Sequence, residues 1–191
     1  MSAVTPSVGA VLCGGASRRM GRDKALVPID GVALARRVAD ALVAGGCSRV
    51  LAVGGDGPAL VALGLEPVPD RWPGEGPLGG LATALGAANE GDVLVLAPCD
   101  LLHPSAAAVA TLLAALDGPE VEAVSVRVGD RVQWLPSAWR VTAGRAAQVA
   151  ALVDGGDRRL DAVAAVVGPG VRTVDLNSAD VADADTPSDL P

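Results

Sequence analysis

The sequence predicts a layered α/β protein with a mostly parallel sheet and an antiparallel addition toward the C-terminus. One observation is the composition: half of the residues are hydrophobic, yet there is no Phe or Tyr and there are only three Trp. Ala, Val and Leu must therefore fill the core, and such side chains suit closely spaced helices and buried strands. The other observation is that strand-like and helix-like segments alternate through the first two-thirds of the chain, which is typical of a parallel sheet with helices on both faces.

The predicted elements follow from apolar runs, helical spacing and turn residues. The first, residues 8–13, is a short apolar run that ends in two glycines, as expected of a buried strand entering a loop. Further strands are predicted at 49–53, 66–68, 92–97, 121–128, 132–139 and 171–176. Helices are predicted at 32–44, 58–63, 79–89, 104–116, 141–153 and 158–166. Gly129 and Asp130 indicate a hairpin, which accounts for the antiparallel addition.

The chain length, charge and apolar runs restrict the class of protein. The 191 residues contain no internal repeat or low-complexity linker, so we expect a single domain, residues 1–191. A formal charge of −7 argues against a general nucleic-acid surface. The longest apolar run, residues 106–116, is too short to span a bilayer, and the N-terminus lacks the features of a secretory signal. We therefore expect a soluble cytoplasmic protein with no nucleic-acid or membrane partner.

The three cysteines give no sign of a disulfide framework or a zinc site. Cys13, Cys47 and Cys99 are odd in number, widely spaced and surrounded by apolar residues. We expect small buried thiols.

The first candidate site is the loop after the first strand, GGASRRMG, which begins with Gly14 and Gly15. Glycines allow a close backbone approach, and consecutive N–H groups can bind an anion. Arg18, Arg19 and Lys24 add the charge needed for a di- or triphosphate. The loop lacks both the Walker ending and the dinucleotide-binding spacing. A flexible turn with solvated arginines is the alternative.

Two later loops carry carboxylates at the predicted carboxyl edge of the sheet. Residues 70–80, DRWPGEGPLGG, combine Asp70 with two glycines that open a helix, whose N-terminus can receive an anion. Asp100 lies just past the end of the strand DVLVLA, where a carboxylate can anchor Mg²⁺ on a nucleotide phosphate. The alternatives are a stiff surface turn for Asp70 and a turn or cap role for Asp100. We interpret the neighbouring His103 as a polar loop residue and leave it out of the site.

Together these segments resemble the molybdenum cofactor guanylyltransferase (MobA-type) family. The family's opening motif, central loop and C-D-x-P motif stand here as LCGGASRRMGRDK, DRWPGEGPLGG and PCDLLHP, in that order. GGDRRLDA and DADTPSDL are similar to its later motifs. The resemblance covers nearly the whole chain and implies a three-layer Rossmann-like nucleotidyltransferase fold.

The resemblance also implies an activity: transfer of GMP from GTP to molybdopterin, or to its molybdenum form, with release of pyrophosphate. Arg19, Lys24 and Asp100 would carry the reaction, with Asp100 binding Mg²⁺. A molybdoenzyme or its chaperone would be the protein partner. By position, the nucleotide would be bound by Leu12, Cys13, Gly14, Gly15, Lys24, Asp70 and Asp100. In-line phosphoryl chemistry needs charge neutralisation and alignment rather than a protein nucleophile, in agreement with a chain that has one histidine.

The chain departs from the family pattern at four places. Cys13 replaces an Ala, Leu102 replaces the Pro of C-D-x-P, Gly54 and Gly55 stand where an Asn is frequent, and Asp183 and Asp185 replace two Asn. The last change places carboxylates near the expected acceptor side, so it affects the acceptor more than the donor. Two alternatives therefore remain: a related cytidylyl or sugar-1-phosphate nucleotidyltransferase, or a non-catalytic nucleotide-binding partner of a molybdoenzyme.

Overall fold

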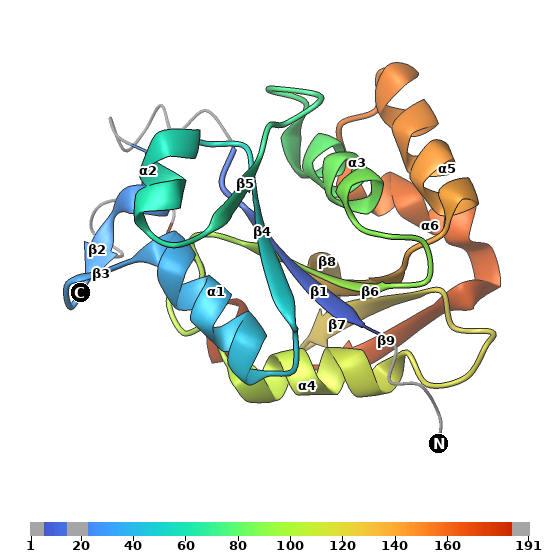
Figure 1. The fold of residues 1–191 in the computed structure, drawn as a ribbon. Helices are drawn as coiled ribbons and strands as arrows, with labels where there is room; N and C mark the ends of the chain where they lie inside the picture. Colours follow the sequence, from blue (N-terminus) through green and yellow to red (C-terminus); the bar gives the residue numbers. More distant parts are fainter. Residues whose placement is uncertain (1–5, 15–22, 185–191) are drawn as a thin grey trace.

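The structure is a computed structural model that describes residues 6–14 and 23–184. Its central feature is a seven-stranded sheet in the order β5-β4-β1-β6-β8-β7-β9, with a separate two-stranded ribbon of β2 and β3 (Figure 1). The strands are β1 (Ser7–Leu12), β2 (Pro28–Ile29), β3 (Val32–Ala33), β4 (Arg49–Val53), β5 (Glu66–Val68), β6 (Val93–Pro98), β7 (Ala123–Val128), β8 (Arg131–Arg140) and β9 (Val171–Asp175). The helices are α1 (Leu34–Ala44), α2 (Gly57–Ala62), α3 (Gly76–Ala87), α4 (Ala106–Ala115), α5 (Ala143–Asp154) and α6 (Val163–Val167). Short 3₁₀ turns are η1 (Lys24–Leu26), η2 (Leu160–Ala162), η3 (Gly168–Gly170) and η4 (Ser178–Val181).

The sheet is mostly parallel with one reversed strand. β5, β4, β1 and β6 run parallel, β8 is antiparallel to both β6 and β7, and β9 is parallel to β7. The predicted α/β class and the antiparallel addition toward the C-terminus are therefore confirmed. The hairpin of β7 and β8 extends the sheet beyond β6.

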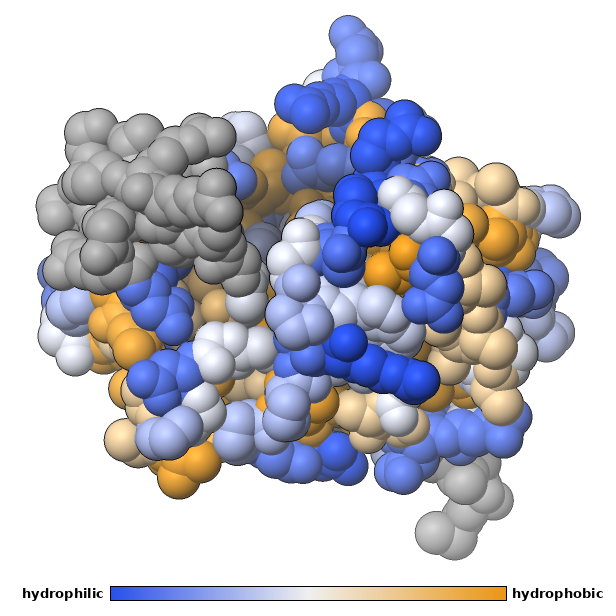
Figure 2. Space-filling view, turned by 90° about the horizontal axis from the view of Figure 1, so that it is seen from above, coloured by the Kyte–Doolittle hydropathy of each residue, from blue (hydrophilic) through white to orange (hydrophobic). Residues whose placement is uncertain are grey.

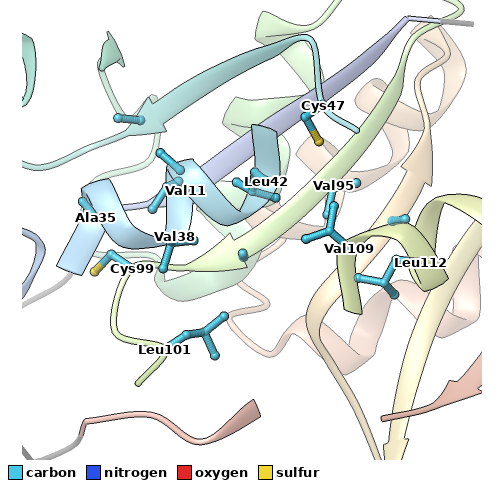
Figure 3. Packing of buried hydrophobic residues seen from close by; sticks show 14 of the residues in the cluster. Val11, Ala35, Val38, Leu42, Cys47, Val95, Cys99, Leu101, Val109 and Leu112 are labelled. Carbon is cyan, nitrogen blue, oxygen red and sulfur yellow. The ribbon is translucent and has the colours of Figure 1, made fainter. Parts of the chain in front are cut away.

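Helices cover both faces of the sheet, and the alternation of side chains along β1 serves both layers (Figure 1). Val8 and Ala10 pack in the cluster beneath α3 and α5, while Val11 and Cys13 pack in the cluster beneath α1 and α4. Figure 3 shows this second cluster between the sheet and the two helices. A strand buried on both faces reads as a continuous apolar run, which is why the sequence signal for β1 is strong.

A close contact between α3 and β1 brings that helix near the end of the strand. A Cβ atom at Gly80 would lie only 2.6 Å from Leu12 Cδ2, so a larger residue would require either the Leu12 side chain or α3 to shift. The glycine pair after Leu78 thus sets the position of the helix whose first turn borders the site described below.

Two local elements differ from the sequence prediction. Residues 32 and 33 form β3 rather than the first turn of a helix, and they pair with β2 across a turn in which Asp30 and Gly31 both have positive φ. The segment predicted as one helix at 158–166 is a 3₁₀ turn followed by the short α6.

None of the helices in the described segments combines the length and the apolar character that a membrane crossing requires. Hydrophilic residues cover much of the described surface in the view of Figure 2.

Candidate functional site

One cleft of about 290 Å³ lies where β1, β4, β5 and β6 end. It joins the three loops that the sequence analysis singled out, as expected because the carboxyl ends of parallel strands meet at one edge. Its lining residues are Leu12, Cys13, Gly14, Lys24, Val53, Asp70, Gly76, Pro77, Gly80, Pro98, Cys99, Asp100 and Leu135. Every predicted site residue in the described segments is in this set, whereas Gly15 and Arg19 lie outside those segments.

Lys24 and Asp100, which both line this cleft, form an ion pair. Lys24 Nζ donates to Asp100 Oδ2 at 2.9 Å, and each side chain is 17% exposed. Lys24 stands in η1, whose first residues are held by the Asp23 carboxylate, which accepts from the N–H of Ala25 at 3.0 Å. Lys24 is the only lysine in the chain. An ammonium and a carboxylate that are 76 residues apart in sequence thus meet within one cleft.

The loop that carries Asp100 is fixed on two sides. The N–H of Cys99 donates to Leu12 O at 3.2 Å, which holds the loop against the end of β1. The C-terminal segment pairs with the other side: the N–H of Ala184 donates to Asp100 O at 3.0 Å, and the N–H of Leu102 donates to Ala182 O at 2.9 Å. Proline has no N–H, so Leu102 makes a bond that the family's Pro at this position cannot make.

The Asp70 carboxylate is oriented by two hydrogen bonds to the same oxygen. Oδ1 accepts from the N–H of Trp72 at 3.0 Å and from the hydroxyl of Thr83 at 2.9 Å. Oδ2 lies on the side of Gly14, 3.6 Å from where a Cβ of that glycine would stand. The second carboxylate oxygen is therefore directed toward the glycine loop, and the sequence analysis missed Thr83 as the residue that contributes to this.

Two glycines allow the residues that follow β1 and β4 to approach each other closely at the cleft. Gly54 has φ +74°, and a Cβ added there would lie 2.8 Å from Gly14 Cα. The N–H groups of Cys13 and Gly14 both donate to Val53 O, at 2.8 and 3.0 Å. Where the family frequently has an Asn side chain, this chain presents a tight backbone-to-backbone contact.

The buried thiols beside the cleft are not nucleophiles at neutral pH. Burial, with a smaller contribution from Asp23, raises the pKa of Cys13 to about 12. Burial is also the main reason why the pKa of Cys99 lies well above its ordinary value. Neither thiol is ionised in the neutral range, which is consistent with a reaction that needs no protein nucleophile.

A second groove of about 690 Å³ adjoins the cleft and shares Pro77, Pro98 and Leu135 with it. Asp183 lies in this groove with Asp161, and the groove also contains Arg131 and Arg159. Asp185 lies outside the described segments.

His103 borders a different groove with Arg37 and Pro104, and it is not among the residues that line the cleft of Lys24 and Asp100.

The fold and the cleft are those of the nucleotidyltransferase class with a Rossmann-like sheet. The chain matches the MobA-like NTP transferase domain over residues 9–168 and therefore belongs to that family. This confirms the resemblance drawn from the motifs.

Named relatives and solved structures agree with this assignment. A molybdenum cofactor guanylyltransferase of Xanthomonas euvesicatoria pv. vesicatoria (strain 85-10) is 39% identical over 114 residues, 60% of this chain and 57% of that protein. One of Rhodobacter capsulatus is 49% identical over 74 residues, 39% of this chain and 37% of that protein. The chain thus spans about half the length of the curated relatives it matches, or less.

The structural neighbours extend over nearly the whole chain. Rv0371c from Mycobacterium tuberculosis H37Rv has a TM-score of 0.73 at 23% identity and covers 98% of this chain and 96% of its own. Molybdopterin-guanine dinucleotide biosynthesis protein A from Archaeoglobus fulgidus has a TM-score of 0.69 at 20% identity and covers 96% and 94%. At these identities the likeness establishes the fold.

The close contact of Gly54 with Gly14 leads to a first prediction. Gly54→Ala combines positive-φ strain with a 2.8 Å clash, whereas Gly31→Ala has the same kind of φ and no atom within 4 Å. We expect Gly31→Ala to lower the free energy of unfolding by about 1–2 kcal/mol and Gly54→Ala to lower it by a further ~1–3 kcal/mol through overpacking. Urea unfolding of both variants measures the difference; equal losses would show that the contact is not tight.

The buried thiols lead to a second prediction, about alkaline stability. Burial raises the pKa of Cys47 from 9.0 to about 12, so above pH 9 the unfolded chain releases a proton that the folded chain retains. The stabilising contribution of this thiol is complete below pH 9 and is lost as the pH rises toward 12, by about 1.4 kcal/mol per pH unit. Cys13 and Cys99, whose pKa values are also raised by burial, contribute in the same sense, and beyond them few groups titrate there, since the chain has no Tyr and one Lys.

The measurement compares the native protein with Cys47→Ala under reducing conditions. Urea unfolding between pH 8 and 10.5 should show a steeper loss of stability with pH for the native protein. Cys47 packs among Leu42 and other residues of the α1 layer, away from the cleft, so the variant leaves the site intact (Figure 3). The same pH slope in both proteins would contradict the prediction.

Proposed function

We propose that this protein transfers GMP from GTP to molybdopterin, or to its molybdenum form, and releases pyrophosphate. The observation that carries the proposal is the meeting of Lys24, Asp100, Asp70 and the backbone of Gly14 in one cleft. The names of the relatives support the guanylyl reaction and the molybdopterin acceptor.

Within this proposal the reaction is an in-line displacement. An oxygen of the acceptor phosphate forms a bond to the α-phosphorus of GTP, and the bond from that phosphorus to the bridging oxygen of pyrophosphate breaks. The Lys24 ammonium offsets the negative charge of the phosphates, and the fixed loops keep the reactants aligned. Arg19 is proposed as a further phosphate contact, although it lies outside the described segments.

The residues at the cleft fit a Mg²⁺ ion that is held largely by the nucleotide. Among the described residues there is no group of three or more His, Cys, Asp or Glu that could form an all-protein metal site. Mg²⁺ commonly uses one or two carboxylates together with substrate phosphates and water, and Asp100 provides such a carboxylate. When bound, Mg²⁺ would neutralise charge on the phosphates.

The first test of the proposal is an assay of pyrophosphate release with GTP and molybdopterin. We expect release by the native protein and none by Asp100→Asn, because the amide removes the negative charge that Lys24 and the metal require. Asp40→Asn is the matched control: Asp40 is also ion-paired, to Arg36 at 2.7 Å, but on the exposed face of α1. Unchanged turnover in Asp100→Asn would refute the role of this carboxylate.

Nucleotide selectivity is part of the same test. A nucleotide that binds only the folded protein raises its melting temperature, so GTP with Mg²⁺ should give a larger rise than CTP, ATP or UTP. An equal or greater rise with CTP would favour a cytidylyltransferase, and nucleotide binding without pyrophosphate release would favour a non-catalytic binding partner.

The ion pair leads to a further prediction about metal binding. Because Lys24 already donates to Asp100 Oδ2, a metal ion without nucleotide must compete with the ammonium for that oxygen. Lys24→Met should therefore bind Mn²⁺ alone several-fold more tightly than the native protein and bind GTP more weakly. Titration calorimetry with Mn²⁺ and with GTP measures both effects, and Lys24→Arg, which keeps the charge, is the control. Equal Mn²⁺ affinity in the native protein and Lys24→Met would contradict the competition.

A further inference from the structure

Thr83 is a buried polar residue in the middle of an otherwise apolar stretch of α3. It is 6% exposed and lies among Leu78, Leu81, Ala84 and Leu85, all of which are buried. A helical threonine commonly returns its hydroxyl to a carbonyl of the preceding turn, as Thr111 does in α4, where it donates to Ala107 O at 2.9 Å. The hydroxyl of Thr83 instead forms its hydrogen bonds with residues of the loop after β5.

The Thr83 hydroxyl makes two hydrogen bonds to that loop, one as a donor and one as an acceptor. It donates to Asp70 Oδ1 at 2.9 Å and accepts from the N–H of Arg71 at 3.1 Å. The N–H of Trp72 donates to the same Asp70 oxygen at 3.0 Å. Asp70 Oδ1 is thus held from two directions, by α3 and by the loop itself.

This arrangement determines which carboxylate oxygen is directed toward the cleft. With Oδ1 occupied, Oδ2 lies on the side of Gly14, and Asp70 lines the cleft. A carboxylate oxygen accepts hydrogen bonds well from the N1–H and 2-amino groups of guanine and from ribose hydroxyls. Two donors hold Oδ1, so Oδ2 is already oriented before a ligand binds. Binding therefore does not incur the entropy cost of ordering this carboxylate.

We infer that Thr83 is a positioning residue: its hydroxyl holds Asp70 so that Oδ2 receives the nucleoside part of the donor nucleotide. This inference rests on the proposed function, because it assigns the ligand of Asp70 to a nucleoside triphosphate. Thr83 itself does not line the cleft, so it acts through Asp70. The inference predicts that the Thr83 side chain contributes to nucleotide affinity and not only to the stability of the loop.

The test is a double-mutant cycle on nucleotide affinity, measured by titration calorimetry of the whole chain with GTP and Mg²⁺. Thr83→Val keeps the shape and removes the hydroxyl, and we expect it to weaken binding about ten-fold, as for the loss of one hydrogen bond to a charged group. Thr83→Ser restores the hydroxyl and should restore the affinity. Thr111→Val is the matched control, since it also removes a helical threonine hydroxyl but outside the site, and it should bind like the native protein.

The decisive comparison is Thr83→Val in an Asp70→Asn background. If Thr83 acts by orienting the carboxylate, the valine should cost much less affinity there than in the native protein. An equal loss in both backgrounds, or no loss in the native background, overturns the inference. Should Thr83→Val fold poorly in thermal unfolding, Thr83→Ala takes its place in both backgrounds, because it removes the same hydroxyl, and the same two outcomes decide.

The outcome for the native protein separates this inference from the proposed function. If the native protein binds CTP rather than GTP, the guanylyl assignment fails, and the same cycle with CTP still decides the role of Thr83. Absence of binding by any nucleoside triphosphate overturns both. To identify which part of the nucleoside Oδ2 receives, inosine triphosphate removes the 2-amino group and 2′-deoxy-GTP removes one ribose hydroxyl; the analogue whose affinity no longer depends on Thr83 identifies the group.

Discussion

The ion pair between Lys24 and Asp100 is the interaction on which the geometry of the cleft depends. Lys24 lies within the first 30 residues, and Asp100 lies in the middle of the chain. They meet because β1 and β6 are parallel neighbours, with Leu12 opposite Pro98. The register places the residues that follow both strands at one edge. Two partly buried charges in contact stabilise each other, whereas either alone would be costly at this position. Under the proposed function, a nucleotide that drew Lys24 toward its phosphates would also free Asp100 for a metal ion, and the binding of nucleotide and metal would then be coupled.

The backbone contributes as much to this cleft as the charges do. Gly54 allows the chain after β4 to approach Gly14, and Gly80 allows α3 to approach Leu12. Two glycines from different parts of the chain therefore permit close packing at the same edge of the sheet. On the opposite side of Asp70, α3 supplies the Thr83 hydroxyl. Helix position and carboxylate orientation are therefore linked, because the same helix carries the glycine that sets its distance and the threonine that fixes the side chain.

The sequence predicted most features that depend on neighbouring residues and missed several that depend on contacts between distant residues. β4 and β5 were predicted with their observed bounds because short apolar runs between turn residues are local signals. β3 was wrongly included in a helix, since two residues show no period of their own and its apolar residues continue the spacing of α1. The carboxylates after strands were identifiable from position, but the contact of Thr83 with Asp70 spans 13 residues and depends on the packing of α3. The one available signal was a lone hydroxyl in an apolar helix, which composition alone cannot distinguish from a tolerated core threonine.

The departures from the family pattern are best understood together. The N–H of Leu102 donates to Ala182 O, and the N–H of Ala184 donates to Asp100 O. These two hydrogen bonds connect the segment that carries Asp183 directly to the loop of the proposed metal ligand. In the adjoining groove, Arg131 and Arg159 oppose the charges of Asp161 and Asp183. The carboxylate at position 183 therefore lies in a groove in which the formal charges of these four side chains cancel. Under the proposed function, an anionic acceptor in this groove would meet less repulsion than Asp183 alone implies. What changes relative to an Asn is the pairing available to the acceptor: a carboxylate accepts hydrogen bonds but cannot donate them.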